Sequence, residues 1–230
     1  MRLAKKIALI SGAGRGIGAA IARKCAAEGA YVGVADLDGA NDVATSIIAS
    51  GGQALPLTLD VTIETQWFDA VRTIQREAGG LNILVNNAGV YERLSIEATT
   101  VEKWDQLMAV NVRGVMLGAK AAIPVMREGG GGSIVNISST ASYKASFATH
   151  YGASKAAVCQ LTKSIALQHA ADKIRCNSVH PGFTATAMGF ESLPQDHRAK
   201  RIAAVPLGRF AEPEEIANAV LFFASDESSY

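Results

Sequence analysis

The sequence has few cysteines and no excess of charge of either sign. Its three cysteines, Cys25, Cys159 and Cys176, are an odd and widely spaced set with no CxxC pair. Such a set indicates reduced packing residues of a cytoplasmic protein rather than a disulfide framework. The 22 basic and 21 acidic side chains leave a net charge of +1, and no basic run occurs. The composition therefore predicts neither a nucleic-acid partner nor a membrane surface.

Histidine pairs, long apolar runs and repeats are also missing. No two of the four histidines form an HxxxH pair, so no metal site is expected. The basic residues Arg2, Lys5 and Lys6 precede only a short apolar run, which predicts a first strand rather than a signal peptide. No apolar run approaches the length of a membrane span. With 49% hydrophobic and 19% charged residues and no internal linker, residues 1–230 predict one folded domain.

Short apolar runs alternate with helical patterns along the whole chain. The expected strands are 7–11, 31–35, 54–59, 81–85, 133–137 and 174–179. The expected helices are about 17–28, 41–50, 62–78 (with Thr62 as its N-cap), 101–127, 151–171 and a last one from 213. This alternation predicts an α/β fold, a doubly wound parallel sheet with helices on both faces. Ligands of such sheets bind beyond the carboxyl ends of the strands.

A glycine-rich turn follows the first expected strand. Residues 11–18 read SGAGRGIG and run directly into a helix pattern. Glycines suit a turn whose backbone bends sharply and approaches a pyrophosphate, while the helix offers free N–H groups. Asp36 lies eighteen residues after Gly18, where an acid binds the ribose hydroxyls and repels a 2′-phosphate. NAD is therefore the expected cofactor, and NADP stays the alternative because Arg15 is able to reach a 2′-phosphate.

Tyr151 and Lys155 lie four residues apart on an expected helix, so their side chains share one face. A free phenol has a pKa of about 10, and a nearby ammonium lowers it toward the neutral range. A hydroxyl of Ser138 or Ser139, at the end of the fifth expected strand, then holds a substrate oxygen. Asn111 stands on an apolar helical face, where an amide must find partners. It is either a satisfied core residue or part of this site.

These pieces, in this order, resemble the short-chain dehydrogenase/reductase family over essentially the whole chain. The matching segments are 11–18, Asp60-Val61, 86–89, Asn111, Ser138-Ser139, 151–155, and Pro181-Gly182 followed by Thr184 and Thr186. The resemblance implies a single Rossmann-like domain, usually with seven parallel strands. It also implies interconversion of an alcohol and a carbonyl with NAD(H) or NADP(H).

The resemblance also implies the role of each residue. Tyr151 is the acid/base, and Lys155 lowers its pKa and bonds the nicotinamide ribose. Asn111 holds a water that links Lys155 to solvent, and the serine bonds the substrate oxygen. The implied cofactor-binding residues are Gly12, Arg15, Gly16, Ile17, Gly18, Asp36, Asp60, Val61, Asn87, Ala88, Gly89, Tyr151, Lys155, Pro181, Gly182, Thr184 and Thr186.

The chain departs from the family pattern in three places. Ser11 replaces the usual threonine and keeps its hydroxyl. Ser138 has the usual thirteen-residue spacing to Tyr151, whereas strand register selects Ser139, which we favour. The sequence stops at Tyr230, where the family's last strand begins, so six strands are expected and the edge of the sixth is open. The homo-oligomer typical of the family, a tetramer or dimer, is expected with that reservation.

The expected function is hydride transfer between NAD(H) and a secondary alcohol or ketone. The alternatives are an NADP-linked ketoreductase, for example of 3-oxoacyl groups, and a catalytically silent dinucleotide-binding protein. Segments 91–94 and 140–150 and a lid at 184–203 are expected to frame the substrate pocket. The apolar side chains that indicate an apolar, cyclic substrate are Phe147, Met188, Phe190 and Leu193. Arg93 and His150 are the candidates for holding an acidic group.

Overall fold

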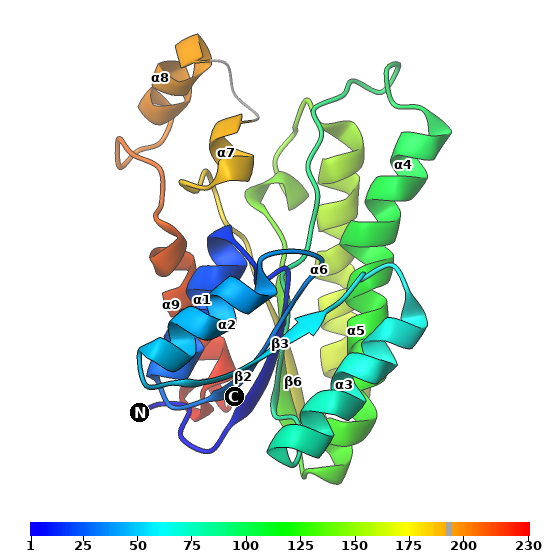
Figure 1. Ribbon diagram of the computed structural model, residues 1–230. Coiled ribbons are helices and arrows are strands. Elements are labelled where there is room, and N and C mark those ends of the chain that lie inside the picture. The colour runs from blue at the N-terminus through cyan, green and yellow to red at the C-terminus, as the bar shows by residue number, and fades with distance from the viewer. Residues whose placement is uncertain (192–194) are drawn as a thin grey trace.

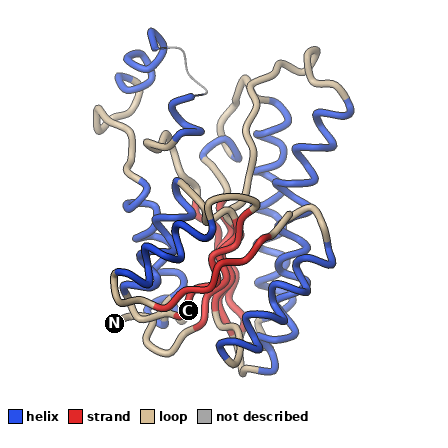
Figure 2. Tube along the Cα trace, viewed as in Figure 1, coloured by secondary structure: helices blue, strands red, loops and turns tan. Residues whose placement is uncertain are grey.

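One parallel sheet organises the chain (Figures 1 and 2). The computed structural model describes residues 1–191 and 195–230, with the side chains of 190–197 left out of the description. Within this part of the chain six strands pair in the order β3-β2-β1-β4-β5-β6. Their bounds are β1 Ile7–Ser11, β2 Tyr31–Asp36, β3 Gln53–Thr58, β4 Ile83–Asn86, β5 Gly132–Ile137 and β6 Ile174–Val179. The expected α/β fold and its six strands are confirmed, with ends shifted by one or two residues.

Helices cover both faces of the sheet, so two apolar cores form (Figure 1). The helices of the first layer are α1 Gly16–Ala27, α2 Ala40–Ala49 and α9 Pro213–Ala224. Those of the second layer are α3 Glu64–Ala78, α4 Val101–Met108, α5 Gly114–Glu128 and α6 Thr149–His169. The short helices α7 Ala187–Glu191 and α8 Gln195–Ala203 project beyond the sheet (Figure 1). Strands β1, β2, β4 and β5 are buried on both faces, which is why they are apolar runs rather than alternating ones, whereas the edge strand β3 is only partly buried.

The strand order reverses beside β1, which pairs with β2 on one side and β4 on the other. Ile10 stands level with Val85 in this pairing. The glycine turn after β1 and the 87–89 loop after β4 therefore leave the sheet side by side. Such a switch point at the carboxyl ends is where open α/β sheets bind their ligands.

The helix expected at 101–127 is not uniform. A π-helical segment, Ala109–Arg113, separates α4 from α5, and it contains Asn111. The spacing of apolar residues in the sequence is almost the same with or without one inserted residue, so the sequence pattern did not reveal the π-helical segment. Single π-turns inside long helices are frequent at functional sites, because the extra residue re-aims side chains and frees backbone groups.

Residues Val101–Glu128 together form a helix long and apolar enough to cross a membrane by length and composition alone. The sequence analysis predicted no apolar segment of that length, and it therefore did not identify this helix. Half of its most apolar stretch is buried inside the molecule, where Leu117 and Met126 pack in the second core. A helix that packs against a sheet in this way passes the same test, so packing accounts for its apolar character.

The expected N-cap of α3 is wrong. Helix α3 begins at Glu64 with Ile63 at its N-cap position and no side-chain cap. The Thr62 hydroxyl instead donates to Asp60 Oδ1 at 2.7 Å, and the Thr62 N–H donates to the same oxygen at 2.9 Å. Because the carboxylate two residues earlier already engages Thr62, that hydroxyl does not cap the helix.

A chain of buried polar side chains crosses the second core. Thr162 donates to the Val158 carbonyl at 2.8 Å, and so it accepts from Asn136 Nδ2 at 2.9 Å. Asn136 Oδ1 then accepts from Asn86 Nδ2 at 2.8 Å. This sequence of donors fixes the orientation of both amides. Asn86 Oδ1 is left buried without a partner among the described residues.

The packing around Gly118 on α5 leaves no room for a larger side chain. A Cβ there would lie 2.4 Å from Asn86 Oδ1 and 2.8 Å from a ring carbon of Trp67. We expect Gly118→Ala to lower the free energy of unfolding by about 1–3 kcal/mol through overpacking, less the roughly 0.5–1 kcal/mol that alanine adds inside a helix. Urea denaturation measures the change.

Gly129 at the end of α5 is the matched control, because a Cβ there meets nothing closer than 3.4 Å and its φ is −76°. We expect Gly129→Ala to leave the midpoint unchanged or raise it. Equal stability of the two variants would show that the Asn86 amide rotates away at no cost.

Candidate active site

The glycine turn and the loop after β4 approach each other without intervening side chains. Gly12 has a φ of +64°, and a Cβ on it would lie 2.7 Å from the Cα of Ala88. A Cβ on Gly18 would lie 2.0 Å from the Gly12 carbonyl oxygen. Asn87 Nδ2 donates to the carbonyls of Ser11 at 3.0 Å and Gly12 at 2.9 Å, which fixes the two loops together. Bare backbone therefore lines this edge, as a pyrophosphate requires.

The N-terminus of α1 opens onto the same place. Arg15 occupies the N-cap position without a side-chain cap, and the first turn holds no acidic residue. The first-turn N–H groups, Gly16 and Ile17 among them, are thus available to an anion. A Cβ on Gly16 would lie 3.4 Å from the Thr186 methyl group, so the segment leading into α7 passes beside this turn. The residues present fit a dinucleotide phosphate.

Asp36, at the end of β2, is fixed next to the glycine turn. Its Oδ2 accepts from the Gly14 N–H at 2.8 Å, and its Oδ1 accepts from the Leu37 N–H at 2.7 Å. Arg15 is exposed and forms no ion pair among the described residues. The carboxylate is therefore the ordered charge at this end of the site, while the guanidinium extends toward solvent.

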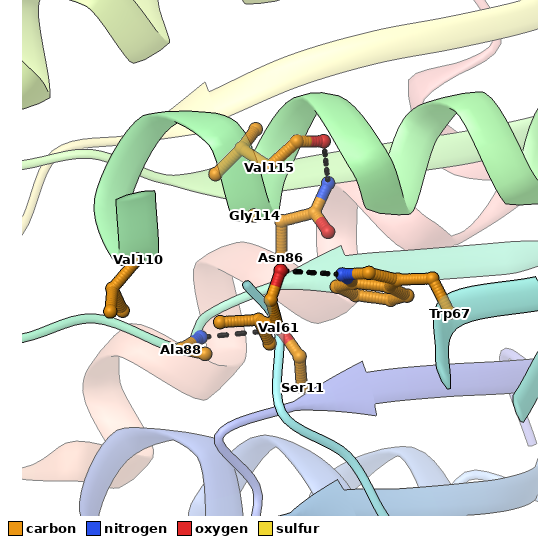
Figure 3. A pocket seen from close by; sticks show the side chains of 8 residues that line it. All are labelled: Ser11, Val61, Trp67, Asn86, Ala88, Val110, Gly114 and Val115. Carbon is orange, nitrogen blue, oxygen red and sulfur yellow. Dashed lines mark hydrogen bonds between the residues drawn. The ribbon is translucent and has the colours of Figure 1, made fainter. Parts of the chain in front are cut away.

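Ser11, Val61 and Ala88 line a narrow space behind the glycine turn that is too small to hold a water molecule (Figure 3). The Ser11 hydroxyl accepts from the N–H groups of Asn87 at 3.1 Å and Ala88 at 3.2 Å. Serine thus keeps the hydroxyl group of the threonine that is usual at this position. The Val61 carbonyl accepts from the Trp67 indole at 3.0 Å (Figure 3), which places Asp60-Val61 beside the switch point.

Two serines follow β5, and only one contacts Tyr151. The Ser139 hydroxyl lies close enough to the Tyr151 phenol to lower its pKa. Ser138 points the other way: it is buried, and its hydroxyl donates to the Lys155 carbonyl at 2.8 Å. Successive side chains of an extended chain alternate in direction, so the two serines serve different partners. The geometry matches the register argument for Ser139 rather than the spacing argument for Ser138.

Burial governs the acidity of Tyr151. Loss of hydration raises the pKa of its phenol, the Ser139 hydroxyl lowers it in part, and the charge of Tyr91 raises it further. The Tyr91 ring stands edge-on to the Tyr151 ring, with centroids 4.9 Å apart at 82°. Burial is the largest influence, so the net pKa of Tyr151 is raised, and the expectation that Lys155 lowers it stays a prediction.

Lys155 lies one turn further along α6 and is itself buried. Its Nζ donates to the Ile137 carbonyl at 2.8 Å and stands 5.8 Å from the centre of the Tyr151 ring. Burial lowers the pKa of this ammonium to about 8. A lysine whose charge is this weakly stabilised exchanges protons readily near neutral pH.

Asn111 is a fully satisfied amide that also borders the site. Its Oδ1 accepts from the Val90 N–H at 2.9 Å, and its Nδ2 donates to the Val90 carbonyl at 3.0 Å and to Ser154 at 3.1 Å. A Cβ on Gly89 would lie 3.3 Å from Asn111 Oδ1 and 3.4 Å from Lys155 Nζ. The bare glycine thus lets the two polar groups face one space, and both readings of Asn111 are compatible with its contacts.

The remaining expected cofactor residues follow β6. Pro181 is buried, and its carbonyl accepts from the Thr140 N–H at 3.1 Å, while Gly182 is exposed. Thr184 is buried and bridges to Ala211. Thr186 accepts from the Gly189 N–H at 3.1 Å. These contacts hold the start of the expected lid against the body of the domain.

The structure places the side chains that were expected around the substrate in different environments. Phe147 is 79% exposed and carries the Arg93 guanidinium 5.4 Å above its ring centre, and Met188 is 48% exposed. His150 is fully buried with neither ring nitrogen bonded to a described residue, so it does not hold an acidic group of the substrate. The side chain of Phe190 and the whole of Leu193 lie outside the described residues.

Sequence reasoning missed two residues that the fold brings to the site. Tyr91 was only one member of a loop expected to frame the pocket, yet its ring contacts Tyr151. His180 precedes the Pro181-Gly182 pair and was passed over, yet it contacts the residues around Ser139. The only signal in the sequence was that Tyr91 and His180 each lie next to a recognised motif. The described residues contain no group of three metal-binding side chains.

Comparisons with known proteins cover almost the whole chain. A family model described as enoyl-(acyl carrier protein) reductase matches residues 12–230. The 3-alpha-(or 20-beta)-hydroxysteroid dehydrogenase of Mycobacterium bovis is 43% identical over 231 residues, which are 100% of this chain and 86% of that protein. A short-chain type dehydrogenase/reductase from Mycobacterium marinum superimposes with a TM-score of 0.95 at 37% identity, covering 99% of this chain and 91% of that one. A 7 alpha-hydroxysteroid dehydrogenase solved with NADH and 7-oxo glycochenodeoxycholic acid superimposes with a TM-score of 0.95 at 33% identity, covering 99% of this chain and 90% of that one.

Proposed function

We propose the chemistry of this site from the premise that the chain belongs to the short-chain dehydrogenase/reductase family. It is an oxidoreductase that acts on the CH–OH group of secondary alcohols, and it binds a nicotinamide dinucleotide. We assign Tyr151 as the acid/base of that reaction. The observation that carries the assignment is that the Ser139 hydroxyl lowers the pKa of the Tyr151 phenol, with a buried Lys155 one turn away.

In this mechanism Ser139 and Tyr151 hold the substrate oxygen between their two hydroxyl groups. Tyr151 takes the alcohol proton during oxidation and returns it during reduction. Lys155 supplies a positive charge to the Tyr151 phenolate and passes the proton on through the space that it shares with Asn111 above Gly89. When bound, the dinucleotide supplies the two-electron redox chemistry. The glycine turn, Asp60-Val61 and the 87–89 loop position it, and Pro181 to Thr186 close over its other end.

We propose NAD rather than NADP as the cofactor, because the Asp36 carboxylate is ordered beside the glycine turn. Asp36→Ala removes the repulsion of a 2′-phosphate and a ribose contact. We expect it to weaken NADH binding about tenfold and to strengthen NADPH binding, as measured by fluorescence titration. Asp38→Asn, an exposed neighbour whose side chain bonds only the Gly39 N–H, is the control and should leave both affinities unchanged.

A preference of the unaltered protein for NADPH would mean that Arg15 outweighs Asp36. The alternative function, an NADP-linked ketoreductase of acyl groups, would then replace the present one. The description of the matching family model as an acyl carrier protein reductase is the observation that favours it.

We propose an apolar, ring-containing secondary alcohol or ketone as the substrate. The Tyr91 ring against Tyr151 offers aromatic surface beside the reacting residue, and the exposed Phe147 adds an aromatic ring in the loop that leads into α6. The hydroxysteroid dehydrogenase from Mycobacterium bovis supports the same class. Residues 184–203 act as a lid over this substrate, and Arg93 is the candidate contact for an acidic group at its far end.

Initial rates with cyclic alcohols, hydroxysteroids and 3-oxoacyl thioesters, each with both cofactors, test the proposal. Oxidation of a cyclic alcohol with NAD is the expected result. Turnover of acyl thioesters alone would select the ketoreductase, and cofactor binding without turnover of any substrate would select a silent binding protein. We further propose a cytoplasmic homo-oligomer. The three free cysteines support the location, and the family supports the assembly.

A further inference from the structure

His180 begins the loop after β6, next to the loop that carries Ser139. Strands β5 and β6 pair with Ile137 opposite Val179, so His180 stands level with the two serines that follow β5. The Ser138 N–H donates to the Val179 carbonyl at 2.8 Å, which extends the pairing to the end of both strands. Beyond that point a short 3-10 turn, Thr140–Ser142, replaces the regular ladder.

The imidazole of His180 bridges this turn to β6. Its Nδ1 lies 3.0 Å from the Ser142 hydroxyl and 3.3 Å from the Ser139 carbonyl oxygen. Its Nε2 lies 2.9 Å from the Ser178 hydroxyl. The thiol of Cys159 lies 3.7 Å from Nε2, as a second and weaker neighbour. Every polar atom of the ring therefore has a partner.

The surrounding donors decide which ring nitrogen carries the proton. The Ser142 hydroxyl lies 2.7 Å from the Ser139 carbonyl, which only accepts, so the single hydroxyl hydrogen is used there. Nδ1 must then be the donor toward Ser142 and the Ser139 carbonyl. Nε2 pairs with the Ser178 hydroxyl. His180 therefore carries a proton on Nδ1.

We infer that His180 is a positioning residue for Ser139, acting through the Ser139 peptide carbonyl. That carbonyl is held by the Ser142 N–H at 3.0 Å, by the Ser142 hydroxyl and by His180 Nδ1. Fixing the peptide plane fixes the direction of the Ser139 side chain, whose hydroxyl accepts from the Ala141 N–H at 3.1 Å and lowers the pKa of Tyr151. Without His180 the Ser139 carbonyl would keep only bonds internal to the turn, and its peptide would be held to the β6 side only by the Thr140 N–H bond to the Pro181 carbonyl.

The inference rests on the proposed role of Ser139 at the substrate oxygen. A displacement of about 1 Å at a reacting group costs on the order of 100-fold in rate. We expect His180→Ala to lower kcat at least about tenfold while the Kd for NADH changes less than about twofold. His180→Asn places an amide N–H near the position of Nδ1–H, and it should restore most of the rate. His180→Gln extends its amide toward the position of Nε2 instead, and it should not.

Two serine variants sharpen the experiment. Ser142→Ala removes the hydroxyl that bridges His180 to the Ser139 carbonyl and leaves only their direct 3.3 Å contact. The double variant with His180→Ala should be no slower than the slower single variant. Ser178→Ala removes only the contact to Nε2 and should leave kcat unchanged. Restoration by Asn but not by Gln, each measured against the unaltered protein, supports the inference even if His180→Ala itself fails to fold, and the non-additivity adds to it where His180→Ala folds.

Other outcomes overturn the inference. If His180→Asn is as slow as His180→Gln, or if the His180 and Ser142 effects multiply, His180 does not act through the Ser139 carbonyl. An unchanged kcat in His180→Ala, alongside an inactive Tyr151→Phe, would reject His180 and leave the proposed function intact. Full activity of Tyr151→Phe would reject the proposed function itself, so the two failures are distinguishable.

Discussion

Tyr151→Phe is expected to lower kcat by a factor of about 100 to 10,000, the range that a positioned acid/base contributes. The substitution removes one oxygen atom and leaves the aromatic ring, so the edge-on contact with Tyr91 stays. The Kd for NADH should stay within about twofold, because the glycine turn, Asp36 and Lys155 are untouched. Stopped-flow or steady-state rates with a cyclic alcohol, paired with a fluorescence titration, separate the two quantities.

The pH dependence of the rate of the unaltered enzyme also tests the role of Tyr151. Burial raises the pKa of Tyr151 in the protein alone, so oxidation needs a positive charge near the phenolate. The rate of oxidation should therefore rise with pH, since deprotonated Tyr151 is the base. Tyr31→Phe, a half-buried tyrosine on β2 away from the site, is the matched control and should change neither rate nor profile. A Tyr151→Phe variant with the same profile and rate would remove Tyr151 from the mechanism.

Lys155→Met is expected to destroy activity and, at the same time, to stabilise the protein without its cofactor. Burial lowers the pKa of Lys155 from 10.5 to about 8, which means that the folded state disfavours the charged amine. A shift of this size corresponds to about 3 kcal/mol of unfolding free energy, at 1.36 kcal/mol per pKa unit. Methionine fills a similar volume without a charge. We expect kcat to fall at least about 100-fold.

The sign of the stability effect makes it easy to check. Below about pH 8 Lys155 is charged in both the folded and the unfolded chain, so the folded state bears the full cost of burying the charge. Between about pH 8 and 10.5 only the unfolded chain holds the proton, and the stability of the unaltered protein rises with pH. The advantage of Lys155→Met should therefore be largest below pH 8 and vanish above 10.5.

Lys163→Met on the same helix is the control, because that lysine is exposed. It should change neither activity nor the pH dependence of unfolding. A lower unfolding midpoint for Lys155→Met at pH 7 would show that the Ile137 hydrogen bond outweighs the cost of burying the charge.

The strands, helix ends and turns of this protein were predictable because a short stretch of sequence specifies each of them. The apolar run 174–179 is β6 with the expected ends, and the glycine after residue 28 ends α1 with a φ of +93°. The glycine turn was predictable for the same reason, since Gly12 and Gly18 are needed wherever backbones approach this closely. The π-helical segment around Asn111 was not predictable, because one inserted residue leaves the apolar pattern of the helix almost unchanged.

The sequence by itself determined the order of strands and helices, the parallel sheet and the position of the site at the carboxyl ends of the strands. Those features follow from apolar periodicity, glycine conformation and short connections, which act over a few residues. Only the tertiary structure decided that Ser139 rather than Ser138 contacts Tyr151, that burial raises the pKa of Tyr151, and that His150 is buried while His180 reaches the Ser139 loop. Hydration and hydrogen-bond partners depend on which distant segments pack together, and no local stretch of sequence specifies that.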